Sequence, residues 1–176
     1  CLSSLKSFYN YLFTEKFILE NPTEMIESSH SWRKLPYIMT IAEVDALISA
    51  PDTRNLIGIR DLAMLELLYA TGVRVSELVS VEMSTIDLKV GYLRSLGKGS
   101  KERVIPLGDA ARIAVENYIL NGRPALLKER NSADLFLTRR GIAMTRQGFW
   151  KTLKRYTIKA RIIGKVSPHT LRHAFA

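Results

Sequence analysis

The sequence predicts a mainly α-helical protein with one small antiparallel β-sheet, an α+β arrangement. Apolar residues recur at steps of three and four in several separate stretches, which is the period of an amphipathic helix. Only residues 86–107 alternate between apolar and polar positions around a glycine-rich turn, the pattern of a β-hairpin. The 176 residues are 47% hydrophobic and 24% charged, with ten glycines and six prolines, so we expect a globular fold with a substantial core. The length fits one domain, or one domain plus a fragment.

The first predicted element is an amphipathic helix over residues 2–19, closed by an Asn-Pro pair. Residues 22–37 then lose the helical period and gather proline, serine and charge, as a linker does. The sequence begins with cysteine instead of methionine and enters helical periodicity at once. We therefore expect residues 1–36 to be the last helix of an N-terminal helical domain plus a linker, and residues 37–176 to form a second domain.

Three further helices are predicted over residues 41–49, 56–70 and 76–81. Thr40 and Glu43 form a capping-box pattern at the start of the first of them, because each side chain can bond to the backbone N–H of the other. The second is mostly apolar and stops at Gly72, a residue type common just after a helix. Residues 86–107 follow as the predicted hairpin, with the two glycines of GKGSK at its tip.

Helices are predicted again over residues 109–121 and 145–163, and from residue 167 onward. In the longer of them, Phe149 and Trp150 have a spacing typical of a buried face. Ser167 is placed as the N-cap of the last helix, because proline follows at the first helical position.

The charge balance favours a polyanion as partner. Twenty-six lysines and arginines stand against 17 aspartates and glutamates, which leaves a formal net charge of +9. Each basic side chain that meets a phosphate releases counterions and gains affinity without discriminating between base sequences. Net charge by itself also fits basic proteins that bind no nucleic acid, so the case needs a site as well.

Composition also limits the kinds of site. A single cysteine excludes an internal disulfide and a cysteine-based zinc site, and three histidines leave little material for another metal cage. We expect no metal and no cofactor. The sequence has no run of about eighteen apolar residues, which argues against a membrane span. We therefore expect a soluble, cytoplasmic protein with no membrane partner.

Four side chains form the candidate catalytic set: Arg74, Lys98, His169 and Arg172. Arg74 follows a glycine break between two apolar helices, although an ordinary surface arginine is the simpler interpretation for it alone. His169 and Arg172 lie three residues apart and share one helix face, where a capping or core histidine is the alternative. Lys98 lies at the hairpin tip, where a lysine either reaches a substrate or stays in solvent. Together these groups can hold a phosphodiester, neutralise its oxygens and move protons without a metal.

Four segments resemble, in this order, the site-specific tyrosine recombinases, also called the phage integrase family: RDLAMLELLYATGVRVSELV, GKGSKERVIPLG, MTRQGFW and SPHTLRHAFA. Within that family the chain is most similar to the bacterial recombinases that resolve chromosome dimers, with phage or integron integrases as the alternative. The resemblance covers nearly the whole chain. It implies a catalytic domain over residues 37–176, preceded by the remnant of a helical DNA-binding domain over residues 1–36.

The resemblance also implies an activity and a role for each matching residue. Such enzymes cut and rejoin DNA through a 3′-phosphotyrosyl intermediate, without ATP or metal. Arg74 matches the first catalytic arginine, and Lys98 matches the hairpin lysine that protonates the leaving 5′ oxygen. His169 and Arg172 match the HxxR box. Glu77 matches a buried acidic position that orients the region of the first arginine, with a plain helix-surface glutamate as the alternative.

Further basic residues are predicted to contact the DNA backbone: Lys101, Arg103, Arg146, Lys151 and Lys154. A solvated helix face is the alternative for the basic residues from Lys151 to Arg161. The partners implied by the resemblance are double-stranded DNA, a sister recombinase in a tetramer on two DNA sites, and a DNA translocase at the division septum.

The sequence departs from the family pattern in one respect. The family places a further histidine or tryptophan, and then the nucleophilic tyrosine, beyond the HxxR box, whereas this sequence ends at Ala176. We expect the 176-residue chain to bind DNA without forming the covalent intermediate. A non-catalytic basic module that binds DNA or RNA remains open as a second class. A metal-dependent nuclease is less favoured, because the acidic residues are scattered.

Overall fold

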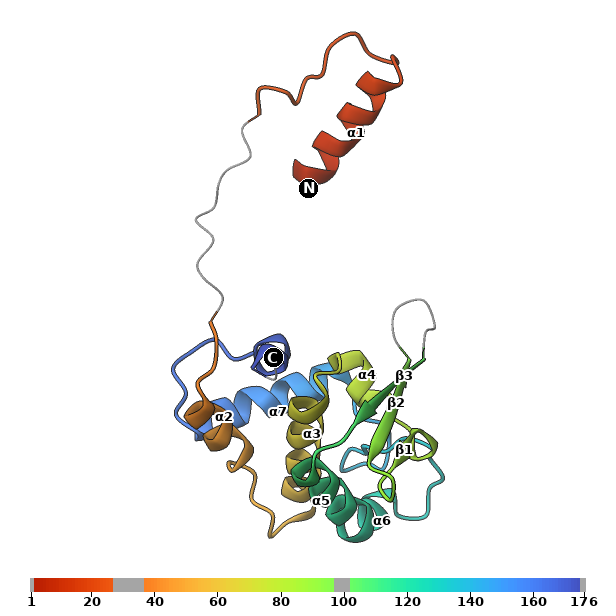
Figure 1. Cartoon of the computed structure of the whole chain (residues 1–176), viewed down its shortest axis with the longest axis vertical. Coiled ribbons are helices and arrows are strands. Elements are labelled where there is room, and N and C mark those ends of the chain that lie inside the picture. The colour runs from red at the N-terminus through yellow and green to blue at the C-terminus, as the bar shows by residue number, and fades with distance from the viewer. Residues whose placement is uncertain (1, 27–36, 97–101, 175–176) are drawn as a thin grey trace. The chain divides into compact units, whose positions relative to one another are not determined.

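The computed structural model describes residues 2–26, 37–96 and 102–174. The chain divides into two compact units, Cys1–Pro36 and Tyr37–Ala176 (Figure 1). The first unit contains helix α1 (Leu2–Thr14), which is shorter than predicted. The helix ends early because Lys16 has a φ of 59°, outside the right-handed helical region. The assignment of this unit to a DNA-binding domain stays a prediction.

The second unit contains α2 (Ile41–Ile48), α3 (Leu56–Thr71), α4 (Val75–Val79), the 3₁₀ turn η1 (Met83–Thr85), β1 (Ile86–Asp87), β2 (Tyr92–Leu96), β3 (Glu102–Pro106), α5 (Asp109–Asn117), the π-helical turn η2 (Tyr118–Gly122), α6 (Arg123–Leu127), α7 (Arg146–Lys159) and α8 (Pro168–His173). The predicted fold class, mainly helical with a small antiparallel sheet, is confirmed. The capping box of Thr40 and Glu43 is present at the start of α2. Ser167 caps α8, also as predicted.

The sheet has the order β1-β2-β3, with antiparallel neighbours. Strands β2 and β3 form the predicted hairpin, and the short β1 adds a strand that the prediction did not separate. Leu93 pairs with Ile86 on one side and with Ile105 on the other. Because Leu93 is fully buried, this register turns one face of the sheet toward the core. The predicted glycine tip lies outside the described residues.

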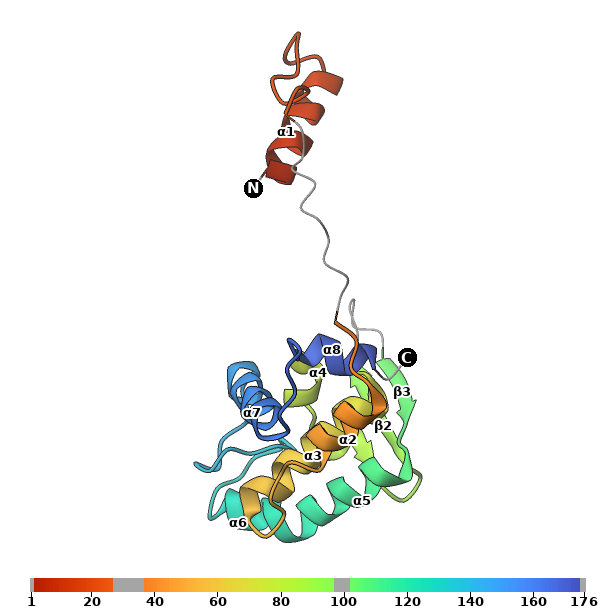
Figure 2. The same cartoon turned by 90° about the vertical axis from the view of Figure 1, so that its left-hand side faces the viewer.

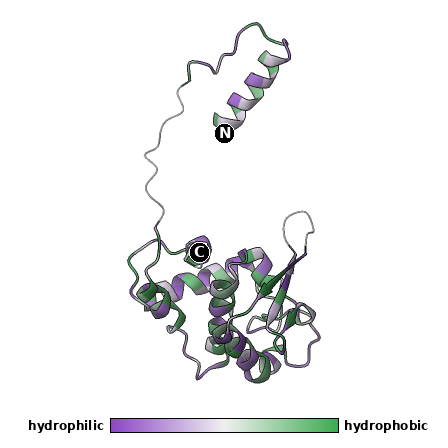
Figure 3. Cartoon of the chain, in the orientation of Figure 1, coloured by the Kyte–Doolittle hydropathy of each residue, from purple (hydrophilic) through white to green (hydrophobic). Residues whose placement is uncertain are grey.

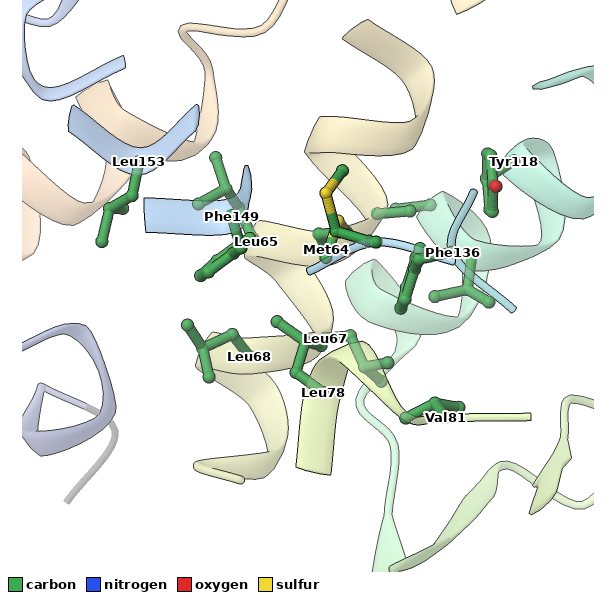
Figure 4. Packing of buried hydrophobic residues seen from close by; sticks show 14 of the residues in the cluster. Met64, Leu65, Leu67, Leu68, Leu78, Val81, Tyr118, Phe136, Phe149 and Leu153 are labelled. Atoms are coloured by element: carbon green, nitrogen blue, oxygen red, sulfur yellow. The ribbon is translucent and has the colours of Figure 1, made fainter. Parts of the chain in front are cut away.

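Helix α3 forms the centre of the core. It contacts α2, α4, α5 and α8. Because other elements cover the helix on several sides, five of its hydrophobic side chains are fully buried. These are Ala63, Met64, Leu65, Leu67 and Leu68. In Figure 4, Leu78, Phe136 and Phe149 come from other elements and surround them. Each large buried side chain contributes roughly 1.5–3 kcal/mol, so α3 is a firm support for the residues that follow it.

Helix α7 is amphipathic, and Figure 3 shows both hydrophobic and hydrophilic stretches along it. Phe149 is fully buried as predicted, but the prediction for Trp150 is wrong, because its side chain is 47% exposed. Consecutive residues on a helix point about 100° apart, so only one of the two can face the core. The helix also ends at Lys159 and not at residue 163, since Arg161 has a φ of 55°.

A buried ion cluster joins α3 to α7. Asp61 is fully buried, and one of its carboxylate oxygens accepts hydrogen bonds from Arg60 Nε and Nη2 at 2.9 and 2.6 Å. The other oxygen accepts from Arg155 Nη2 at 2.7 Å and from the hydroxyl of Tyr156 at 2.9 Å. The cluster thereby satisfies both oxygens of a charge that would otherwise be costly to bury.

Two kinds of feature are absent from residues 2–26, 37–96 and 102–174. No helix in these ranges combines the length and the hydrophobicity needed to cross a bilayer. Nor do these ranges bring three or more His, Cys, Asp or Glu side chains together in a group that could hold a metal ion.

Candidate functional site

Arg74 lies directly after the central helix. Gly72 ends α3 in the left-handed conformation, with φ 55° and ψ 24°, and its N–H donates to the carbonyl oxygen of Leu68. Val73 then inserts into the core and is only 1% exposed. Arg74 follows as the N-cap of α4, with a side chain that is 47% exposed. The glycine turn and the buried valine thus fix the backbone from which the guanidinium group projects.

Glu77 holds Arg74 through both the backbone and the side chain. The backbone N–H of Arg74 donates to Glu77 Oε2 at 2.8 Å, and Arg74 Nη1 donates to Oε1 at 2.9 Å. The Glu77 side chain is only 10% exposed. Its predicted role, to orient the region of Arg74, therefore has a geometric basis.

A second arginine reaches the same carboxylate. Arg103 on β3 donates from Nη2 to Glu77 Oε2 at 3.1 Å, although the two residues are 26 positions apart in the sequence. Burial raises the pKa of Glu77, but the hydrogen bonds from Arg74 and the charges of both arginines outweigh it, so the net pKa lies below the usual value. Glu77 is therefore a carboxylate held between two guanidinium groups at neutral pH.

Helix α8 presents the HxxR residues from a firmly anchored turn. Ser167 and Thr170 form a capping box at its start, and Leu171 is fully buried against the core. His169 is exposed and Arg172 is half-buried. Neither of these two side chains has a hydrogen bond or ion pair with any other described residue. Both groups are therefore available to a ligand.

Helix α8 packs against α3, the helix that ends three residues before Arg74. Figures 1 and 2 place α4, α8 and the adjacent ends of β2 and β3 at the same end of the second unit. The structure thus gathers the elements that carry Arg74, His169 and Arg172. Lys98 lies outside the described residues. That all four groups meet at one phosphate stays a prediction.

The predicted DNA-binding residues fall in three places. Arg146, Lys151 and Lys154 are exposed on α7, where Trp150 lies beside Arg146 and Lys151 in a shallow depression. Arg103 is on β3 and bonds to Glu77, a link that a motif search along the chain cannot find. Lys101 lies outside the described residues. Contact of any of these side chains with DNA stays a prediction.

Comparison with known families gives one match that covers most of the chain. The model of the Phage integrase family matches residues 38–176. The chain is 47% identical to tyrosine recombinase XerD of Oceanobacillus iheyensis over 176 residues, covering 99% of this chain and 59% of the relative. It is 45% identical to tyrosine recombinase XerD of Halalkalibacterium halodurans over 175 residues, covering 99% of this chain and 58% of the relative. The chain thus spans about three fifths of the length of these curated relatives.

A solved structure supports the fold. The integrase of the Tn1549 transposon, in complex with circular intermediate DNA, superposes with a TM-score of 0.75 at 21% sequence identity. The match covers 99% of this chain and 62% of that one. The resemblance found in the four sequence segments is thereby confirmed at the level of both sequence and fold.

Proposed function

Because the chain belongs to the phage integrase family, we propose that the protein is a site-specific recombinase that cuts and rejoins DNA. One observation carries the proposal: α4, which begins at the half-exposed Arg74, lies at the same end of the second unit as α8, the helix of the exposed His169 and the half-buried Arg172 (Figure 2). Two guanidinium groups suit the paired oxygens of a phosphodiester, and the imidazole can transfer a proton beside them.

The proposed reaction is a transesterification. A tyrosine hydroxyl attacks the scissile phosphorus and forms a bond to the 3′ phosphate, while the bond from phosphorus to the 5′ oxygen breaks. Lys98 gives a proton to that leaving oxygen, and His169 accepts the proton that the tyrosine hydroxyl loses as it attacks. Arg74 and Arg172 stabilise the negative charge that develops on the non-bridging oxygens. The reverse reaction on a partner strand rejoins the DNA without an external energy source.

Positive side chains supply the charge stabilisation in this scheme, so it calls for no metal or other cofactor. The relatives named XerD support a role in resolving chromosome dimers. We place this role in the cytoplasm, at cell division. Double-stranded DNA, a sister recombinase in a tetramer on two sites, and a septal DNA translocase are the proposed partners.

The test is covalent capture. The full-length protein is mixed with a DNA site that carries a nick close to the cleavage position, so that a short fragment diffuses away after cleavage. We expect a protein–DNA adduct on a denaturing gel, with a free 5′ hydroxyl on the released fragment. DNA binding with no adduct would instead assign the protein to the non-catalytic binding class.

A further inference from the structure

Arg103 and Arg74 bind the same carboxylate from two separate elements. Arg74, at the start of α4, donates from Nη1 to Glu77 Oε1 at 2.9 Å, and Arg103, on β3, donates from Nη2 to Oε2 at 3.1 Å. We propose that Arg103 is a positioning residue: it neutralises Glu77, so that Arg74 is held in place yet keeps its positive charge for the scissile phosphate. This inference rests on the proposed recombinase function.

The argument begins with charge. An arginine paired with a carboxylate is neutral overall, and a neutral pair attracts a phosphate weakly. Glu77 is only 10% exposed, so water screens its negative charge poorly. A second arginine on the same carboxylate leaves the group of three with a net charge of +1. Glu77 can then orient Arg74 without cancelling the charge that the reaction needs.

The sheet register directs Arg103 toward this site. Arg103 pairs with Ser95, and the next pair in the ladder is Val104 with Arg94. Directly paired residues share a face and neighbouring pairs alternate, so Arg103 and Arg94 lie on opposite faces of the sheet. Ser95 is buried and Val104 is 65% exposed, which identifies the Arg103 face as the inner one.

The competing explanation is the one predicted from the sequence, that Arg103 contacts the DNA backbone directly. The two explanations differ in what they require of Glu77. A direct phosphate contact contributes whether or not position 77 is charged. Arg103 can neutralise Glu77 only while the carboxylate is present. The effects of substituting residues 103 and 77 on the cleavage rate must therefore be coupled.

The experiment is a double-mutant cycle in the full-length protein with Arg103→Gln, Glu77→Gln and the double variant. Single-turnover cleavage of the nicked site is measured with the DNA saturated by protein. We expect Arg103→Gln to slow cleavage by about tenfold to a hundredfold, by analogy with the loss of groups that orient the ligands of metal sites. When Glu77 is already Gln, the Arg103→Gln change should slow cleavage by less than about threefold, because position 77 then has no negative charge for Arg103 to neutralise.

Arg94→Gln is the matched control. Arg94 is as exposed as Arg103, at 45% against 44%, and it lies on the same sheet but on the outer face. It donates instead to the backbone oxygen of Ser84. The same loss of charge there should leave the cleavage rate within about twofold, since Arg94 lies on the opposite face of the sheet from Arg103 and pairs with Glu102, not with Glu77.

Arg103→Lys separates loss of charge from loss of folding. The contact with Glu77 uses a single nitrogen of Arg103, so a lysine can replace it and should keep cleavage within about threefold of the wild type. Thermal unfolding of each variant shows whether the Gln variant has folded. A Lys variant that is as slow as the Gln variant contradicts charge compensation.

Two further results overturn the inference. One is that Arg103→Gln slows cleavage by the same factor with Glu77 and with Gln at position 77, and also lowers the slope of log K for DNA binding against log salt by about 0.9. That fall in slope is the sign of a lost phosphate contact. The other is wild-type cleavage by Arg103→Gln. If the wild-type protein itself forms no adduct, the proposed function fails, and that result is distinct from either of these.

Discussion

The ring of Tyr37 lies against the backbone of Gly164, so closely that a Cβ atom at position 164 would overlap the ring. Tyr37 is the first residue of the second unit, and Gly164 belongs to the loop that leads into α8. The hydroxyl of Tyr37 also donates to Glu43 in the capping box of α2. This one side chain therefore ties the beginning of the unit to the segment just before the HxxR residues.

Gly164→Ala should destabilise the protein by about 1–3 kcal/mol, because the added methyl group overpacks against the ring. Urea unfolding of the 176-residue chain measures this. In a Tyr37→Ala background the same substitution should cost almost nothing, since the obstructing ring is gone. If Gly164→Ala lowers the free energy of unfolding equally with Tyr and with Ala at position 37, the ring is not what requires glycine at position 164.

The phenol of Tyr37 should lose its proton at a higher pH than an ordinary tyrosine. Burial, followed by the hydrogen bond to Glu43 and its charge, raises the pKa of Tyr37 from 10.0 to about 12. The unfolded chain loses this proton first, so the stability that the phenol contributes is complete below pH 10 and is lost as pH rises toward 12. The tyrosinate absorbance of the wild type minus that of Tyr37→Phe isolates the residue. A midpoint near pH 10 in the difference curve contradicts the prediction.

Asp61→Asn should destabilise the protein by about 3–5 kcal/mol, because it leaves the buried guanidinium of Arg60 without its counter-charge. Asp109→Asn is the control: its side chain is 88% exposed and pairs with Arg112 on the surface. That change should cost less than about 1 kcal/mol, since exposed ion pairs contribute little. Urea midpoints of the two variants give the comparison, and equal midpoints would contradict the predicted role of the cluster.

Arg74→Ala and Arg172→Ala should each slow single-turnover cleavage by the full-length protein by roughly a hundredfold to a thousandfold, the range for losing one preorganised donor to a developing charge. DNA affinity should fall much less, because both residues act mainly on the transition state. Wild-type cleavage rates in either variant would remove that residue from the proposed site.

Lys154→Gln should lower the salt dependence of DNA binding. Each lost phosphate contact reduces the slope of log K against log salt by about 0.9. Arg112→Gln removes the same charge from α5, where the arginine is already paired with Asp109, and should leave the slope unchanged. A slope that stays constant for Lys154→Gln would favour a solvated α7 face.

Features encoded by neighbouring residues were predictable from the sequence. The capping box at Thr40, the glycine stop at Gly72 and the Ser-Pro start of α8 all depend on groups within four positions of one another. Such signals act before any tertiary contact forms. For the same reason, the glycine break before Arg74 and the start of the helix that contains His169 could be placed correctly.

Side-chain orientation was less predictable. Trp150 has an apolar side chain at a plausible core spacing, yet the core accommodates its neighbour Phe149 instead. The predicted helix over residues 109–121 continues beyond its expected end through a π-helical turn into α6. Local periodicity cannot choose between two adjacent apolar residues, because that choice depends on which side of the helix the other elements occupy.

The sequence by itself determined the family, the order of the elements and the residue types offered to a phosphate, because motifs and helix signals are written in short runs of residues. Only the tertiary structure decided that Arg103 shares Glu77 with Arg74, that Asp61 joins α3 to α7, and that Tyr37 lies on Gly164. These pairs are 26 to 127 positions apart in the chain. The packing of the whole unit brings them together, and no local pattern encodes that packing.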